Sequence, residues 1–175
     1  MTAPRNFEGQ ARRGGDWNGR SRSVAAPFHF RRTAGLASFV GMSEIADYVN
    51  HNAGLVTPSV VESLLRKLPM WKVAFAQINA PKFPHLVTQL EFLTEAVEDF
   101  AEGAYKDLPY VAFAAAVFAL TYAHKKVDLI PDHFGELGRA DDSSVVRAVL
   151  IQHEKAFAKY AAGQGVDWVR ITSKP

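Results

Sequence analysis

The chain has 175 residues and a mass of 19.3 kDa, a length that favours one compact domain with a tail over two full domains. It contains no cysteine, which excludes a disulfide framework, a thiolate zinc site, an iron–sulfur cluster and a cysteine nucleophile. With 48% hydrophobic and 22% charged residues, the composition also excludes wholesale disorder and a polytopic membrane protein. We therefore expect a globular domain that buries a core of its own.

Charge is distributed unevenly along the chain. The first 35 residues hold seven arginines against one glutamate and one aspartate, a net charge of +5, whereas residues 36–175 carry 13 basic and 16 acidic side chains, a net charge of −3. The basic segment has no hydrophobic repeat of 2 or 3.6 residues that could bury one face. The sequence therefore predicts a flexible Arg-rich arm over 1–35, a helical domain over 36–163 and a tail over 164–175.

The arm has three interpretations. Its forked arginine donors match phosphate and predict a tether to nucleic acid, a ribosomal surface or anionic lipid. It could equally be a solvated linker, or a targeting peptide, although Glu8 and Asp16 do not suit the acid-poor composition of such peptides. The tether assigns partner contacts to Arg12, Arg13, Arg20, Arg22, Arg31 and Arg32.

The first two predicted helices are separated by a short turn. The first runs from Leu36 to about Val49, where two asparagines and Gly54 follow. Thr57 and Pro58 predict the start of the second, because threonine caps helix amides and proline fits the first helical position. The apolar stripe of this helix comprises Val60, Val61, Leu64, Leu65 and Leu68. Pro69 predicts its end or a kink.

A loop over 79–84 precedes the helix with the clearest two-faced pattern. Its apolar residues recur at steps of four and three, at Leu86, Leu90, Leu93, Val97 and Phe100. Its opposite face carries Glu91, Glu95, Glu98 and Glu102. A di-iron bundle needs Glu-x-x-His pairs that face the core, so the sequence predicts a solvated acidic face, which could also meet a basic partner. Gly103 predicts the end of this helix.

Residues 108–123 contain no charged side chain. As a helix these 16 residues would span about 24 Å. A bilayer core about 30 Å thick requires roughly 20 residues, so the segment is too short to cross it. They predict a central buried helix, with membrane insertion as the alternative. A last long helix is predicted from Asp141 or Asp142 to Gly163, and Val166–Thr172 is expected as an extended or surface segment.

A motif begins in the last turns of the helix over 108–126 and continues through the segment that follows to the start of the last long helix. The residues that carry it are Tyr122, Asp128, Leu129, Ile130, Pro131, Asp132, Gly138, Asp141 and Asp142. This pattern resembles the YkvA-like family, a bacterial helical domain of unknown function that also occurs in some membrane-bound RING-type ubiquitin ligases. Lys126 and Gly135 replace prolines of the family, and His133 and Arg139 replace apolar residues. The resemblance implies a helical hairpin around an acidic loop, with Tyr122, Pro131 and Gly138 as structural positions, and supplies no activity.

The aspartates of this loop could bind a divalent metal. Asp128, Asp132, Asp141 and Asp142 are hard oxygen ligands that suit Mg²⁺, Mn²⁺ or Ca²⁺. With the nearby imidazoles of His124, His133 and His153 they could activate water. The structural interpretation is that the first two aspartates accept backbone amides in a proline turn, that Asp141 or Asp142 caps the following helix, and that His153 is a core histidine.

No phosphate-binding loop, nucleophile elbow, zinc-protease pair or dinucleotide fingerprint occurs in the sequence. We therefore predict an all-α fold of five or six helices around the helix over 108–126. The predicted function is a non-enzymatic accessory protein, cytoplasmic or peripheral to a membrane, that docks on a larger protein or membrane-associated complex and whose arm orders on that partner. The alternatives are a metal-dependent hydrolase centred on Asp128, Asp132 and Asp142, and a nucleic-acid or ribosome binder that uses the arm. Apart from this metal no cofactor is predicted, nor is a small-molecule substrate.

Overall fold

A computed structural model describes residues 42–124 and 139–172. The chain divides into two units, residues 1–36 and 37–175, and every described residue belongs to the second. The predicted arm and the start of the first predicted helix lie outside the described residues. The described part contains α-helices and no strand, which confirms the all-α fold class. The helices are α1 (Met42–Ala53), α2 (Pro58–Ala76), α3 (Leu86–Glu102), α4 (Tyr110–His124), α5 (Ala140–Gln152), α6 (Glu154–Gly163) and α7 (Trp168–Thr172).

The turn between α1 and α2 follows the predicted capping pattern at one end only. Thr57 has extended backbone, with φ −103° and ψ 161°, and its hydroxyl accepts the Val60 amide at 3.4 Å, so the predicted start of α2 is confirmed. The predicted end of α1 near Val49 is too early. The Asn52 side chain donates to the Tyr48 carbonyl at 2.8 Å, a bond to the preceding turn that keeps this asparagine inside the helix.

Pro69 does not end α2, which continues to Ala76. The helix buries one side chain per turn on both sides of the proline, namely Leu64, Leu68, Trp71 and Phe75. A proline inside a helix costs about 3 kcal/mol, and burial of the two aromatic side chains beyond it contributes a comparable amount. The apolar stripe therefore runs past Pro69, whereas Val60, predicted to belong to it, is exposed.

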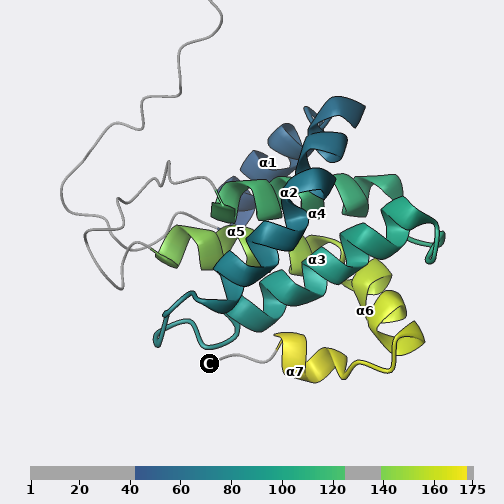
Figure 1. The fold of residues 1–175 in the computed structure, drawn as a ribbon. Helices are drawn as coiled ribbons and strands as arrows, with labels where there is room; N and C mark the ends of the chain where they lie inside the picture. The colour runs from purple at the N-terminus through teal and green to yellow at the C-terminus, as the bar shows by residue number, and fades with distance from the viewer. Residues whose placement is uncertain (1–41, 125–138, 173–175) are drawn as a thin grey trace, which may run out of the picture. The chain divides into compact units, whose positions relative to one another are not determined.

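The antiparallel neighbours α3 and α4 form the centre of the domain. In α3 the predicted stripe is confirmed, since Leu86, Leu90, Leu93 and Val97 are buried. Gly103 ends this helix with a left-handed backbone, φ 76°. The predicted burial of α4 is also confirmed: ten of its residues are buried, and it packs against α1, α2, α3 and α5 (Figure 1). Among the described residues, no helix has both the length and the apolar character that a membrane span requires.

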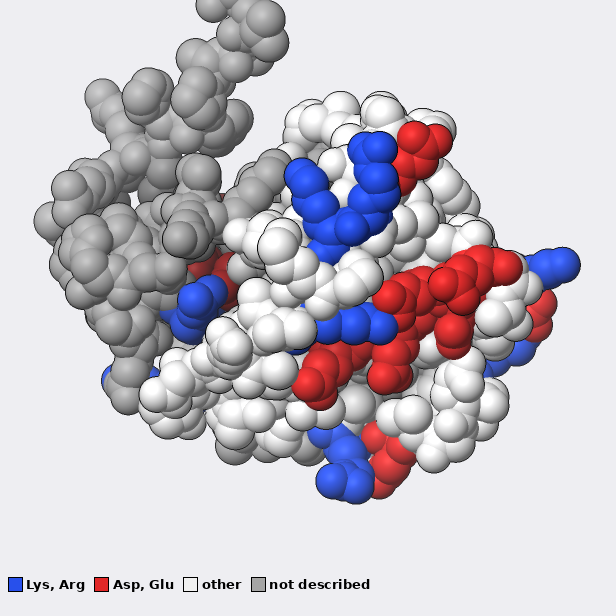
Figure 2. Space-filling model, viewed as in Figure 1, with Lys and Arg blue, Asp and Glu red and all other residues white. Residues whose placement is uncertain are grey.

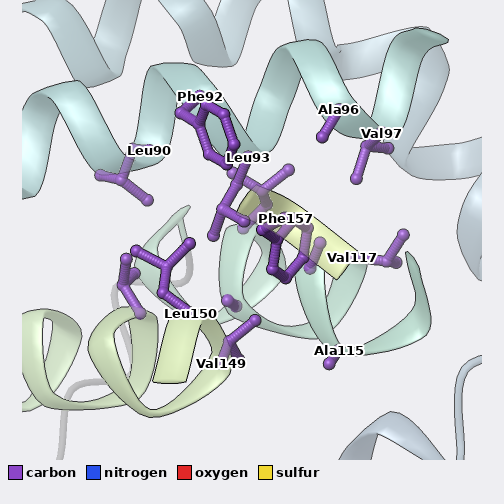
Figure 3. Packing of buried hydrophobic residues seen from close by; sticks show 14 of the residues in the cluster. Leu90, Phe92, Leu93, Ala96, Val97, Ala115, Val117, Val149, Leu150 and Phe157 are labelled. Carbon is purple, nitrogen blue, oxygen red and sulfur yellow. The ribbon is translucent and has the colours of Figure 1, made fainter. Parts of the chain in front are cut away.

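The predicted last long helix is two helices. At His153 the backbone leaves the helical region, with φ −113° and ψ 26°, and α6 departs in a new direction from α5. This break lets Phe157 and Tyr160 pack against Phe92 of α3, with ring centroids 6.1 and 5.5 Å apart. Figure 3 shows Phe157 among side chains of α3, α4 and α5. The gain from burying two aromatic rings explains why one straight helix does not form.

The segment predicted as extended or on the surface is also helical. Ile171 of α7 is buried, and its carbonyl accepts the Gln89 side-chain amide of α3 at 2.8 Å. The described residues therefore form seven helices, whereas five or six were predicted. The prediction did not separate α6 from α5, and it did not include α7.

Candidate functional site

The structure brings together the first and last residues of the predicted motif. Tyr122, near the end of α4, donates its hydroxyl hydrogen to Asp141 Oδ2 in α5 at 3.1 Å. The other oxygen of that carboxylate accepts the Asp142 amide at 3.0 Å. These residues flank 125–138 on both sides, so the bond joins the two helices that the motif was expected to connect.

Asp142 is fully buried. Its Oδ2 accepts a hydrogen bond from Arg139 Nη1 at 3.0 Å, and the side chain of this arginine is also largely covered. A buried carboxylate requires such a charged partner. The predicted helix cap is wrong in detail, because Arg139 occupies the cap position and both aspartates lie in the first turn of α5. There their charge still suits the helix dipole.

The tyrosines around this acidic pair are held in the protonated form. Burial raises the pKa of Tyr122 far above its ordinary value, and the Asp141 charge and hydrogen bond raise it further. Tyr48 of α1 lies edge-on to the Tyr122 ring at 6.2 Å, and burial and then Asp141 raise its pKa as well. Neutral tyrosines donate hydrogen bonds and do not act as bases at neutral pH. The hydrogen bond from Tyr122 to Asp141 connects α4 with α5, and the ring contact between Tyr48 and Tyr122 connects α1 with α4.

The predicted metal ligands divide between described and undescribed parts of the chain. Asp128, Asp132, Pro131, His133 and Gly138 lie outside the described residues, as do the six arm arginines. Within residues 42–124 and 139–172, no group of three or more histidine, aspartate or glutamate side chains is placed to hold a metal ion. The four-aspartate metal site therefore stays a prediction.

The two described histidines near the motif pack on aromatic rings. His124 stacks on Trp71 of α2, with ring centroids 4.0 Å apart. His153 lies edge-on to Phe157 at 6.4 Å and is partly buried, which lowers its pKa. It is thus a histidine of the core boundary, placed at the break between α5 and α6.

A row of carboxylates follows the outer face of α3, as predicted (Figure 2). We call it the acidic ridge, and it comprises Glu91, Glu95, Glu98 and Glu102. All are exposed except Glu98, which is partly buried and pairs with Lys72 of α2. The neighbouring Asp99 belongs to the interior side, because it accepts hydrogen bonds from the Tyr160 hydroxyl at 2.7 Å and from the Gln164 amide at 2.8 Å.

A small hollow that sequence reasoning missed lies between the segment before α3 and the first turns of α5. Its volume is about 210 Å³, and its polar lining comprises Lys82, His85, Gln89, Ser143, Ser144 and Arg147. The two halves of this lining are more than 50 residues apart in the chain, so no local motif marks it. The spacing of Ser143 and Arg147, one helical turn apart, was the only available signal.

Comparison with known proteins finds no family model, no curated protein and no solved structure that matches this chain. The resemblance to the YkvA-like family, which was drawn from the motif residues, therefore stays a prediction.

Proposed function

We propose that this protein is a non-enzymatic interaction protein, whose helical domain docks on a larger protein or membrane-associated complex and whose Arg-rich arm orders on that partner. The observation that carries the proposal is the acidic ridge on α3. Along a helix of 17 residues, about 25 Å long, the ridge offers one sign of charge to a partner with a basic surface.

Apart from the ion pair between Glu98 and Lys72, this row of like charges does not stabilise the fold. Carboxylates three or four residues apart on one helix face repel each other by a few tenths of a kcal/mol per pair. Glu91, Glu95 and Glu102 make no ion pair with any residue that the structure describes. A basic partner would relieve this repulsion, which supports a role for the ridge in binding.

Exposed apolar side chains lie on the neighbouring helix. In the same helix as Lys72, which pairs with Glu98, Met70 and Val73 lie one turn apart, and their exposed fractions are 62% and 60%. A protein interface combines a small apolar area that becomes buried with a charged rim. The outer faces of α2 and α3 supply both components, so they form the surface we assign to docking.

The test is the native mass of the full-length protein purified from its own source at near-physiological salt, first without and then with detergent. We expect an assembly well above 19.3 kDa. The double variant Glu91→Lys/Glu95→Lys should release the 19.3 kDa chain, because it reverses the charge of the ridge. The matched control Asp47→Lys/Glu154→Lys changes two exposed carboxylates on α1 and α6 and should leave the assembly intact.

Three outcomes would contradict the proposal. The first is a 19.3 kDa monomer in both fractions, and the second is an assembly that the ridge variant retains. The third is turnover of a substrate at an ordinary enzymatic rate by protein that lacks residues 1–35. Co-purified nucleic acid that is lost when Arg12, Arg13, Arg20 and Arg22 become alanine, with steep salt dependence, would favour the nucleic-acid binder instead.

A further inference from the structure

The hollow beside α5 has a basic polar lining. Three segments form it: the residues just before α3, the first turn of α3, and the first two turns of α5. Among its lining residues the structure describes no carboxylate. The side chains that can carry positive charge there are Lys82, His85 and Arg147.

Arg147 is the residue that points to a ligand. It is partly buried, and it makes no ion pair or side-chain hydrogen bond with a residue that the structure describes. A partly desolvated cation without a counter-ion is unfavourable. Asp142 does not compensate it, because that carboxylate is buried against Arg139 on another side of α5.

A hydroxyl group and a helix end complete the lining. Ser143 precedes Arg147 by one turn and so shares its face of α5, whereas the Ser144 hydroxyl already donates to the Ala140 carbonyl at 2.7 Å. Ser143 is therefore the hydroxyl in this lining that can donate to a ligand. The α3 helix starts beside it at Leu86, and its amino-terminal end adds partial positive charge.

We propose that this hollow binds the phosphate group of a small phosphomonoester or inorganic phosphate. The guanidinium fork of Arg147 matches two phosphate oxygens, and Ser143 donates to a third oxygen. A volume of about 210 Å³ is below the 300–1,000 Å³ typical of drug-sized ligands. It therefore suits a single phosphate group with a short substituent and not a nucleotide.

The test is calorimetric titration of the full-length protein with inorganic phosphate, glycerol phosphate and acetate in a phosphate-free buffer. We expect saturable binding of one phosphate or glycerol phosphate per chain and at least tenfold weaker binding of acetate. Arg147→Gln should weaken phosphate binding at least tenfold. Arg66→Gln, which removes an exposed arginine of α2 away from the hollow, should leave it unchanged.

Several results would overturn the proposal. These are no saturable binding by the native protein at millimolar phosphate, equal weakening by Arg66→Gln, or acetate binding as tight as phosphate binding. Circular dichroism must show that Arg147→Gln is folded. If Arg147→Gln is not folded, the site is tested with Ser143→Ala. A several-fold loss of phosphate affinity in this variant supports the site, and an unchanged affinity contradicts it.

Discussion

The helices α3 and α4 are neighbours of similar length, 17 and 15 residues, but they differ in how much of their surface is buried. In α4 ten of the 15 residues are buried, whereas α3 buries one face (Figure 3) and exposes the acidic ridge on the other (Figure 2). A helix without charge must be enclosed, and a two-faced helix forms a boundary. The difference locates the core on α4 and the surface available to partners on α3.

A charge placed in α4 should have the largest effect. Ala116 is fully buried, so Ala116→Asp buries a carboxylate without a partner and should cost more than about 4 kcal/mol of the free energy of unfolding. Because domains are stable by only about 5–15 kcal/mol, this variant should be largely unfolded. The measurement is urea unfolding followed by circular dichroism.

The matched control is Ala101→Asp, an exposed alanine in the last turn of α3. There the new charge opposes the helix dipole and should cost less than about 1 kcal/mol. Equal losses for the two variants would show that α4 is no more enclosed than the boundary helix, and the comparison would fail.

The polar end of α4 should show an intermediate effect. Tyr122→Phe removes the hydrogen bond to Asp141 and should cost about 1 kcal/mol at neutral pH. Above pH 10 the unfolded chain loses tyrosine protons, whereas folded Tyr122 keeps its proton because its pKa is raised. The folded state then binds more protons, so native stability should fall as the pH rises above about 10.

Urea unfolding at pH 8, 10 and 11 tests this expectation. Tyr122→Phe should reduce the alkaline loss of stability without abolishing it, because burial and Asp99 also raise the pKa of Tyr160. A variant with the same alkaline loss as the native protein would show that Tyr122 ionises normally and that the bond to Asp141 is absent in solution.

Removing charge from the ridge should have the smallest effect on stability. Glu91→Gln/Glu95→Gln relieves repulsion between exposed carboxylates, so it should stabilise the protein by no more than about 0.5 kcal/mol. The gain should shrink as salt is added. Thermal unfolding at low and high ionic strength measures it, and destabilisation by more than about 1 kcal/mol would mean that these side chains support the fold.

The sequence was informative where structure depends on neighbours in the chain. The stripe of α3, the burial of α4 and the Thr57 cap follow from local period and capping chemistry, and all three are confirmed. The continuation through Pro69 and the break at His153 depend on aromatic side chains that pack against other helices. Tertiary contacts of this kind override local signals.

The candidate sites follow the same division. The motif predicted a hairpin, and the Tyr122–Asp141 bond joins its two described ends. The hollow could not be predicted in this way, because Lys82 and Arg147 are separated by more than 60 residues and by two intervening helices. Only the folded chain brings their charges to one place.

The packing of α1 has a consequence for synthesis of the chain. The side-chain amide of Gln152 in α5 donates to the Ala46 carbonyl in α1 at 3.2 Å, across 106 positions of sequence, and α1 also packs against α4. Because chains are made from the amino-terminal end, the face of α1 that carries the buried Val49 stays exposed to solvent until α4 and α5 have been synthesised. The first described helix is thus among the last to obtain its neighbours.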